Sequence, residues 1–89
     1  MLRITVEGNA SEDRWILQGN LTERTVAEFL SSWRSSVAGK PRVVDLNEVT
    51  TIDKSGEETI SLVMDEGAKV VASGVYTQFL LGELRARKP

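Results

Sequence analysis

The feature that most constrains the fold is the order in which two spacings of apolar residues follow one another. Apolar and polar residues alternate from Leu2 to Glu7 and again around Trp15 and Leu17, which is typical of strands with one buried face. From Val26 to Val37 the apolar residues follow the spacing of one helical face. The first part of the chain therefore predicts a helix preceded by two strands, which the short polar segment 7–13 joins as an antiparallel hairpin.

The second part of the chain repeats the pattern of a strand followed by a helix. Apolar segments at 42–46 and 68–72 predict strands, and helical spacing predicts helices from about Ser55 to Asp65 and from Val75 to about Arg87. The predicted order is β-β-α-β-α-β-α. Because strand-helix-strand crossovers force parallel pairing, we expect an α/β domain with one mixed sheet of about four strands and helices packed on it.

The strand at 42–46 is expected at the centre of this sheet. Its adjacent residues Val43 and Val44 point to opposite faces of a strand, so two apolar residues in a row indicate burial on both faces, between helices. Gly39 and Pro41 precede the strand and should end the first helix.

Cap residues and apolar stripes predict how the helices begin and which faces they bury. Thr22 is a plausible N-cap for the first helix, and Leu21 and Val26 would then form a hydrophobic staple. Three apolar stripes should face the sheet. They comprise Val26, Phe29, Leu30, Trp33 and Val37 in the first helix, Ile60, Val63 and Met64 in the second, and Phe79, Leu80 and Leu84 in the third.

Composition limits what the chain can do. Its 89 residues fit a single domain spanning 1–89, with 40% hydrophobic residues and a net charge of −2 that offers no extended positive surface to nucleic acid. There is no cysteine and no histidine, which removes thiolate chemistry, the usual general base and the commonest metal ligand. We therefore expect a protein that is not an enzyme. Neither a signal peptide nor an apolar run of membrane-spanning length is present, so the expected location is cytoplasmic.

The stretch "VVDLNEVTTIDKSGEE", residues 43–58, runs from the central strand through a polar tract into the second helix. Ser55 can cap this helix, and Glu58, three residues later, would complete a capping box. Asp53 could cap instead, or brace the preceding loop through its carboxylate. Both interpretations are purely structural, because serine and aspartate are common helix caps.

The same stretch, together with the order of elements, resembles the STAS family, which is named for sulphate transporters and anti-sigma factor antagonists. In that family a buried strand ending in an aspartate leads through a loop to an Asp-Ser-Ser-Gly or Asp-Thr-Ser-Gly-like motif at a helix start. Asp45 matches the strand aspartate, Asp53 the motif aspartate, Ser55 the second hydroxyl position and Gly56 the glycine. The segment "QGNLT", residues 18–22, also resembles the end of the family's second strand, and the likeness extends over the whole chain.

The resemblance implies a regulatory module that binds a protein partner. In anti-sigma factor antagonists the serine matching Ser55 is phosphorylated by a kinase that doubles as an anti-sigma factor, and only the unmodified form binds that partner. A phosphate would add up to about two negative charges at the docking surface. The docking surface so implied is the loop from Asp53 to Gly56 together with the exposed face of the second helix. Its residues are Asp53, Lys54, Ser55, Gly56 and Glu57, with Asp45 bracing the loop.

Four positions depart from the family pattern. Lys54 stands where the family often has a first serine or threonine, and Thr22 stands where these antagonists commonly have an aspartate. Glu57 and Glu58 suit a helix N-terminus, but they would repel a phosphate on Ser55. We therefore expect phosphorylation of Ser55 to be slow or absent.

Two other functions stay open at this point. A STAS-like subunit that binds the ATPase of an ABC-type lipid transport system would use the same surface without phosphorylation. A small-molecule or nucleotide-binding domain would use the backbone N–H groups of the "IDKSGEE" helix start, although Glu57 and Glu58 oppose an anion there.

Neither a cofactor nor a metal is expected. The acidic residues Asp45, Asp53, Glu57 and Glu58 lack the spacing of a calcium-binding loop.

Overall fold

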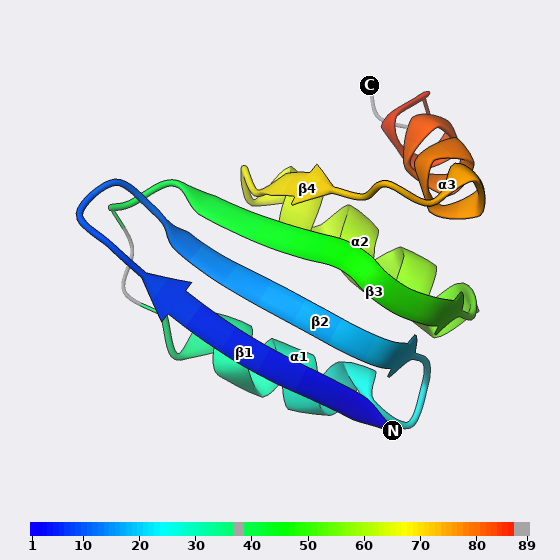
Figure 1. Cartoon of the computed structure of the whole chain (residues 1–89), viewed down its shortest axis with the longest axis horizontal. Coiled ribbons are helices and arrows are strands. Elements are labelled where there is room, and N and C mark those ends of the chain that lie inside the picture. Colours follow the sequence, from blue (N-terminus) through cyan, green and yellow to red (C-terminus); the bar gives the residue numbers. More distant parts are fainter. Residues whose placement is uncertain (37–38, 87–89) are drawn as a thin grey trace.

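The structure, a computed structural model, describes residues 1–36 and 39–86 and has the predicted order of elements. The last residues assigned to the first and third helices from sequence, Val37 and Arg87, lie outside these ranges. The elements are β1 (Leu2–Gly8), β2 (Asp13–Leu21), α1 (Val26–Arg34), β3 (Arg42–Ile52), α2 (Lys54–Asp65), β4 (Lys69–Val71) and α3 (Val75–Ala86) (Figure 1).

The four strands form one mixed sheet in the order β1-β2-β3-β4. β1 and β2 pair as an antiparallel hairpin, whereas β3 is parallel to both β2 and β4. In the hairpin turn, the side-chain carbonyl of Asn9 accepts hydrogen bonds from the backbone N–H groups of Ser11 and Glu12. The predictions of a mixed sheet, of the hairpin and of an inner position for the strand at Val43–Leu46 are confirmed.

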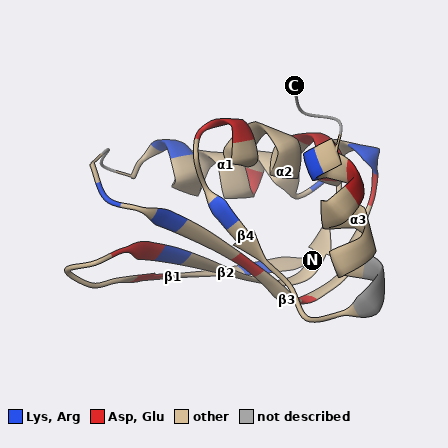
Figure 2. Cartoon of the chain, turned by 90° about the horizontal axis from the view of Figure 1, so that it is seen from above, with Lys and Arg blue, Asp and Glu red and all other residues tan. Residues whose placement is uncertain are grey.

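β3 was expected to lie between helices on both faces of the sheet, but the structure arranges the helices differently. α1 and α2 both lie on one face of the sheet, and α3 lies beyond the β4 edge, next to α2 (Figures 1 and 2). Val43 and Val44 are both buried, as predicted, but only Val44 belongs to the main core. Val43 points to the opposite face, where Arg14 and Lys69 are its neighbours in register. Long side-chain stems of this kind can shield an apolar residue without a helix.

The core between the sheet and the helices is built around two tryptophans. The ring centroids of Trp15 and Trp33 are 4.8 Å apart, and Phe29 packs against Trp33 at 6.0 Å. Both indole N–H groups have acceptors: that of Trp15 donates to Ser32 Oγ, and that of Trp33 donates to Glu66 Oε1. The burial predicted for Phe29 and Trp33 of the first helix is therefore confirmed.

β3 is longer than predicted, because the polar tract after Leu46 continues the strand to Ile52. Between Ile16 and Gln18 of β2, and again between Gly19 and Asn20, β3 contains one residue more than its partner. These bulges change the spacing of buried residues from two to three, so that Leu46, Val49 and Ile52 face the core. A strand with this spacing does not show the alternation on which sequence-based prediction depends.

Two local predictions about the helices are wrong. α1 begins at Val26 rather than after Thr22, so the Leu21–Val26 staple does not form at its predicted position. Thr25 holds the preceding turn instead: its hydroxyl donates to Asn20 O and accepts from the backbone N–H of Thr22. In α3 the buried residues include Leu80, Leu81 and Leu84, whereas Phe79, which was expected inside, is 65% exposed.

The described part of the chain has no helix with the length and apolar character needed to cross a bilayer. Acidic and basic residues are interspersed along its helices and strands (Figure 2).

Candidate functional site

Asp53 joins three segments of the chain at the start of α2. Its Oδ1 accepts from the backbone N–H of Gly56, and its Oδ2 accepts from that of Glu23, each at 2.9 Å. Its own backbone N–H donates to Leu21 O at 3.3 Å. Asp53 is therefore the N-cap of α2, as one of the two predicted arrangements had it. The other arrangement, a capping box of Ser55 and Glu58, is wrong, because Ser55 is the second residue of the helix.

The two hydrogen bonds to the Asp53 carboxylate favour its charged form. The backbone N–H of Glu23 contributes most and that of Gly56 next, and together they hold the pKa of Asp53 below its ordinary value of 3.8. A carboxylate whose pKa is lowered by folding stabilises the folded state above the unfolded-state value and loses that contribution as the pH falls through the folded-state value.

We therefore expect the stability advantage of the parent over Asp53→Asn to shrink on acidification. Asparagine can still cap the helix, but it carries no charge to be titrated. The measurement is urea unfolding of both proteins from about pH 6 to about pH 2.5, with Glu7→Gln on the edge strand as a control for loss of an exposed carboxylate. An advantage that stays constant or grows towards low pH would contradict this prediction.

Gly56 allows the start of α2 to press against the end of β2. A Cβ atom at this position would collide with the backbone oxygen of Leu21 and would lie 2.9 Å from Ile52 Cγ2. Gly56 is buried, so the prediction that it forms part of a partner-binding surface is wrong. It sets the position of the helix and offers no surface to a partner.

The other residues of the predicted docking surface are accessible. Lys54 and Glu58 are exposed, and Ser55 and Glu57 are partly exposed. Within the described residues, no hydrogen bond is formed by the Ser55 hydroxyl, whereas its backbone oxygen accepts from Thr59 Oγ1 inside the helix. The first turn of α2 thus presents a hydroxyl group between a lysine and two glutamates.

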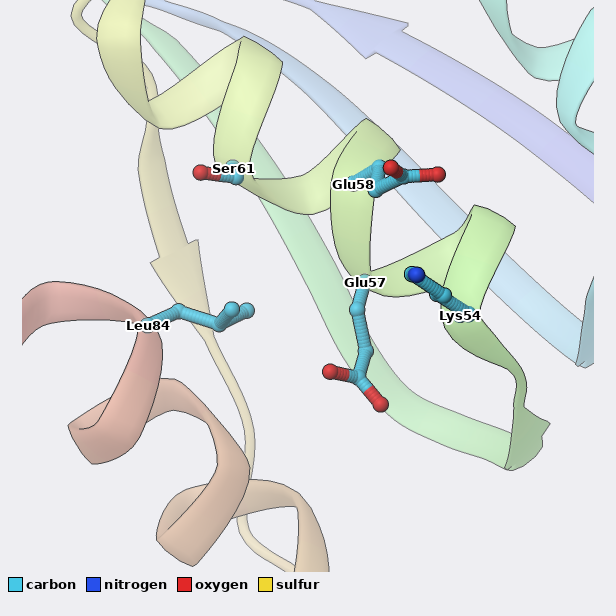
Figure 3. A pocket seen from close by; sticks show the side chains of 5 residues that line it. All are labelled: Lys54, Glu57, Glu58, Ser61 and Leu84. Atoms are coloured by element: carbon cyan, nitrogen blue, oxygen red, sulfur yellow. The ribbon is translucent and has the colours of Figure 1, made fainter. Parts of the chain in front are cut away.

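This turn continues into a groove of about 490 Å³ between α2 and α3. Its lining residues are Lys54, Glu57, Glu58, Ser61 and Leu84 (Figure 3). Glu57 projects into the gap between the helices, and Leu84 of α3 points towards α2. Ser61 was not predicted to belong to the site, and Leu84 was predicted only as a core residue, because the participation of both depends on where α3 lies beside α2.

Asp45 lies away from this site. It is in the middle of β3, where its Oδ2 pairs with Arg14 Nη1 at 3.1 Å and its Oδ1 accepts from the backbone N–H of Asn47 at 2.9 Å. The predicted role of bracing the loop before α2 is therefore wrong. Asp45 instead braces the first bulge of β3, eight positions before Asp53.

The acidic residues of the motif do not converge. Asp45 is paired with Arg14, both oxygens of Asp53 accept backbone hydrogen bonds, and the structure's described ranges hold no group of three or more acidic residues suited to a metal ion. Glu57 and Glu58 border the groove, which makes it unfavourable for a phosphate group.

The sequence matches no protein-family model and no curated protein. Among solved structures, the chain is similar to an anti-sigma factor antagonist STAS domain from Rhodobacter sphaeroides, with 21% identity and a TM-score of 0.65 over 84% of this chain and 88% of that one. An uncharacterised Shewanella loihica protein with a SpoIIAA-like fold is 14% identical, with a TM-score of 0.63 over 99% of this chain and 80% of that one. Similarity also extends to 19% of a longer chain described as Mglu, where 79% of this chain is covered at 21% identity and a TM-score of 0.64.

At these identities the likeness concerns the fold. The chain has a STAS-like, or SpoIIAA-like, α/β fold, and the resemblance seen in the sequence is confirmed at that level.

Proposed function

We propose that this STAS-like chain is a regulatory module that docks a protein partner through the first turn of α2 and the groove beside it. The observation that carries the proposal is a firmly held helix start with accessible side chains. Asp53 fixes the turn through Glu23 and Gly56, while Lys54 and Ser55 remain accessible to solvent. A surface that is already ordered loses little conformational entropy when a partner binds.

The charge pattern of this surface supports docking more than a phosphate switch. The Ser55 hydroxyl has no hydrogen-bond partner in the described residues and could accept a phosphate. However, Glu57 and Glu58 lie on the same turn and would repel the added charge. We therefore propose that the unmodified serine is the binding form and that phosphorylation, if a partner kinase exists, is slow.

The favoured context is anti-sigma factor antagonism, which is the activity named for the similar Rhodobacter sphaeroides domain. The partner would then be an anti-sigma factor kinase. A second candidate is an accessory subunit that binds the ATPase of an ABC-type lipid transport system, which Glu57 and Glu58 favour because that role needs no phosphoserine. Both roles are non-enzymatic and cytoplasmic, and they use the same residues: Asp53, Lys54, Ser55, Glu57 and Glu58.

Replacing Ser55 tests the docking role. Ser55→Asp should weaken binding of a partner identified by pull-down by about tenfold, because it adds a charge within the interface. Ser55→Ala should change affinity by less than about twofold. Since Asp53 is the cap, neither variant should change the free energy of unfolding by more than about 0.5 kcal/mol. Calorimetric titration and parallel thermal melts give both quantities.

Ser31→Asp is the matched control, since it adds the same charge on the exposed surface of α1. It should bind the partner as the parent does. Equal affinities for Ser55→Asp, Ser31→Asp and the parent would remove Ser55 from the interface and refute docking at this turn.

A further inference from the structure

β1 is an edge strand of seven residues, and its only neighbour among the described strands is β2 (Figure 1). At the two ends of the hairpin, the backbone N–H of Asn20 donates to Met1 O and that of Asn9 donates to Glu12 O, at 3.1 and 3.0 Å. Bonded pairs alternate along an antiparallel ladder, so the odd-numbered residues of β1 bond to β2. The even-numbered residues point their N–H and C=O groups outward, where they can pair with a further strand.

Arg3 and Glu7 lie on the face of β1 that points away from the core, each two residues from Thr5. Both are exposed, and neither forms an ion pair within residues 1–36 and 39–86. Arg14, which lies across from Glu7 in β2, is already paired with Asp45. Charges on an edge strand ordinarily keep other strands away. Two opposite charges placed symmetrically can instead attract a strand that carries them in the reverse order.

β1 of a second copy presents this reverse order. If two copies of β1 pair antiparallel about a two-fold axis through Thr5, Arg3 of each copy lies opposite Glu7 of the other, and Ile4 lies opposite Val6. The charged pairs then occupy the positions without hydrogen bonds, where facing side chains are closest. The outward N–H and C=O groups of the even-numbered residues bond across the axis. Opposite charges and β-branched residues that face each other across strands stabilise a sheet, and Val6, 50% exposed in the single chain, would be covered.

We propose that β1 pairs with β1 of a second copy in this register, which joins two four-stranded sheets into one. The second copy is the occupant because the charge order of β1 is complementary to itself, and because the register that aligns the charges also pairs the strand over its full length. An interface of two short edges buries little surface, so the dimer should be weak. The proposal is independent of docking at α2, and it leaves the stability of the chain unchanged at concentrations too low for association.

The test exchanges the charges. Arg3→Glu and Glu7→Arg each place like charges opposite one another, and each should weaken self-association about tenfold or more relative to the parent. An equimolar mixture of these two variants should regain the affinity of the parent within about threefold, because opposite charges face each other again between the unlike chains. The double variant Arg3→Glu/Glu7→Arg should regain it without mixing. Sedimentation velocity over a concentration series measures the association.

Hydrogen exchange locates the contact. The outward amides of Ile4 and Val6 should become more protected as the concentration of the parent rises, whereas those of Thr5 and Glu7, which already bond to β2, should change little.

Arg24→Glu and Glu48→Arg are the control pair, since they make the same charge changes at exposed positions outside β1. Alone and mixed, they should associate as the parent does. A parent that stays monomeric up to about 1 mM would overturn the proposal and leave Arg3 and Glu7 as guards of the edge. So would a mixture that associates no better than its two components, or association without protection of Ile4 and Val6.

Discussion

Trp33→Ala should lower the free energy of unfolding by about 3 to 5 kcal/mol. The indole is 1% exposed and packs between Trp15 and Phe29, so truncation removes a large buried ring and leaves a cavity. It also removes the donor to Glu66 and the ring over which the Arg42 guanidinium lies, 4.1 Å from the centroid. Small domains are stable by only about 5 to 15 kcal/mol, so this variant should lose a large share of its stability and unfold at a clearly lower urea concentration than the parent.

Urea unfolding followed by circular dichroism measures this loss without relying on the fluorescence of the replaced residue. Trp33→Phe is the matched control, because it retains an aromatic ring and gives up mainly the indole N–H. It should cost clearly less, about 1 to 3 kcal/mol. A Trp33→Ala variant within about 1 kcal/mol of the parent would mean that the aromatic cluster is not the centre of the core.

Gly56→Ala should destabilise the domain by about 2 kcal/mol, although alanine favours helices. Replacing a glycine inside a helix ordinarily gains up to about 1 kcal/mol. Here the new methyl group would meet the backbone oxygen of Leu21, which cannot rotate away as a side chain could. Overpacking costs about 1 to 3 kcal/mol, and contact with backbone favours the upper end, so the collision outweighs the gain in helix propensity.

Gly82→Ala is the control for this substitution. Gly82 is also helical, but it is exposed, and apart from its chain neighbours and the backbone of its own helix, a Cβ atom added there would meet no described atom within 4 Å. Alanine at this position should therefore stabilise the domain by up to about 1 kcal/mol. Opposite signs for the two variants, measured by chemical unfolding, are the expected result. Stabilisation by both would show that α2 can move away from Leu21 at little cost.

The order of elements was predictable because each type has its own spacing of apolar residues. The hairpin, the parallel crossovers and the inner position of β3 followed from that order and from the adjacent residues Val43 and Val44. The end of β3 was not predictable in this way. Its bulges depend on pairing with β2, and they replace the two-residue spacing with one of three.

The site was predictable as a segment but not in its details. Asp53 and Ser55 are both good caps, and what favours Asp53 is the backbone N–H of Glu23, thirty positions earlier in the chain. The groove beside α2 could not be predicted without knowing where α3 lies. The apolar residues of α3 are compatible with more than one buried face, so the sequence leaves this position open. Because α3 lies beside α2 at the edge of the sheet, Leu81 is buried and Phe79 is exposed.

The two bulges of β3 together decide which face of the sheet the last residues of the strand occupy. Each adds one residue relative to β2 and thereby exchanges the inner and outer faces, so a single bulge would bring Ile52 to the wrong side of the sheet. Two of them cancel. β3 reaches Asp53 with the same even-numbered positions facing inward as at Val44, and α2 begins on the correct face. Losing one of these two extra residues would therefore invert the connection of β3 to the helix, whereas losing both would preserve it.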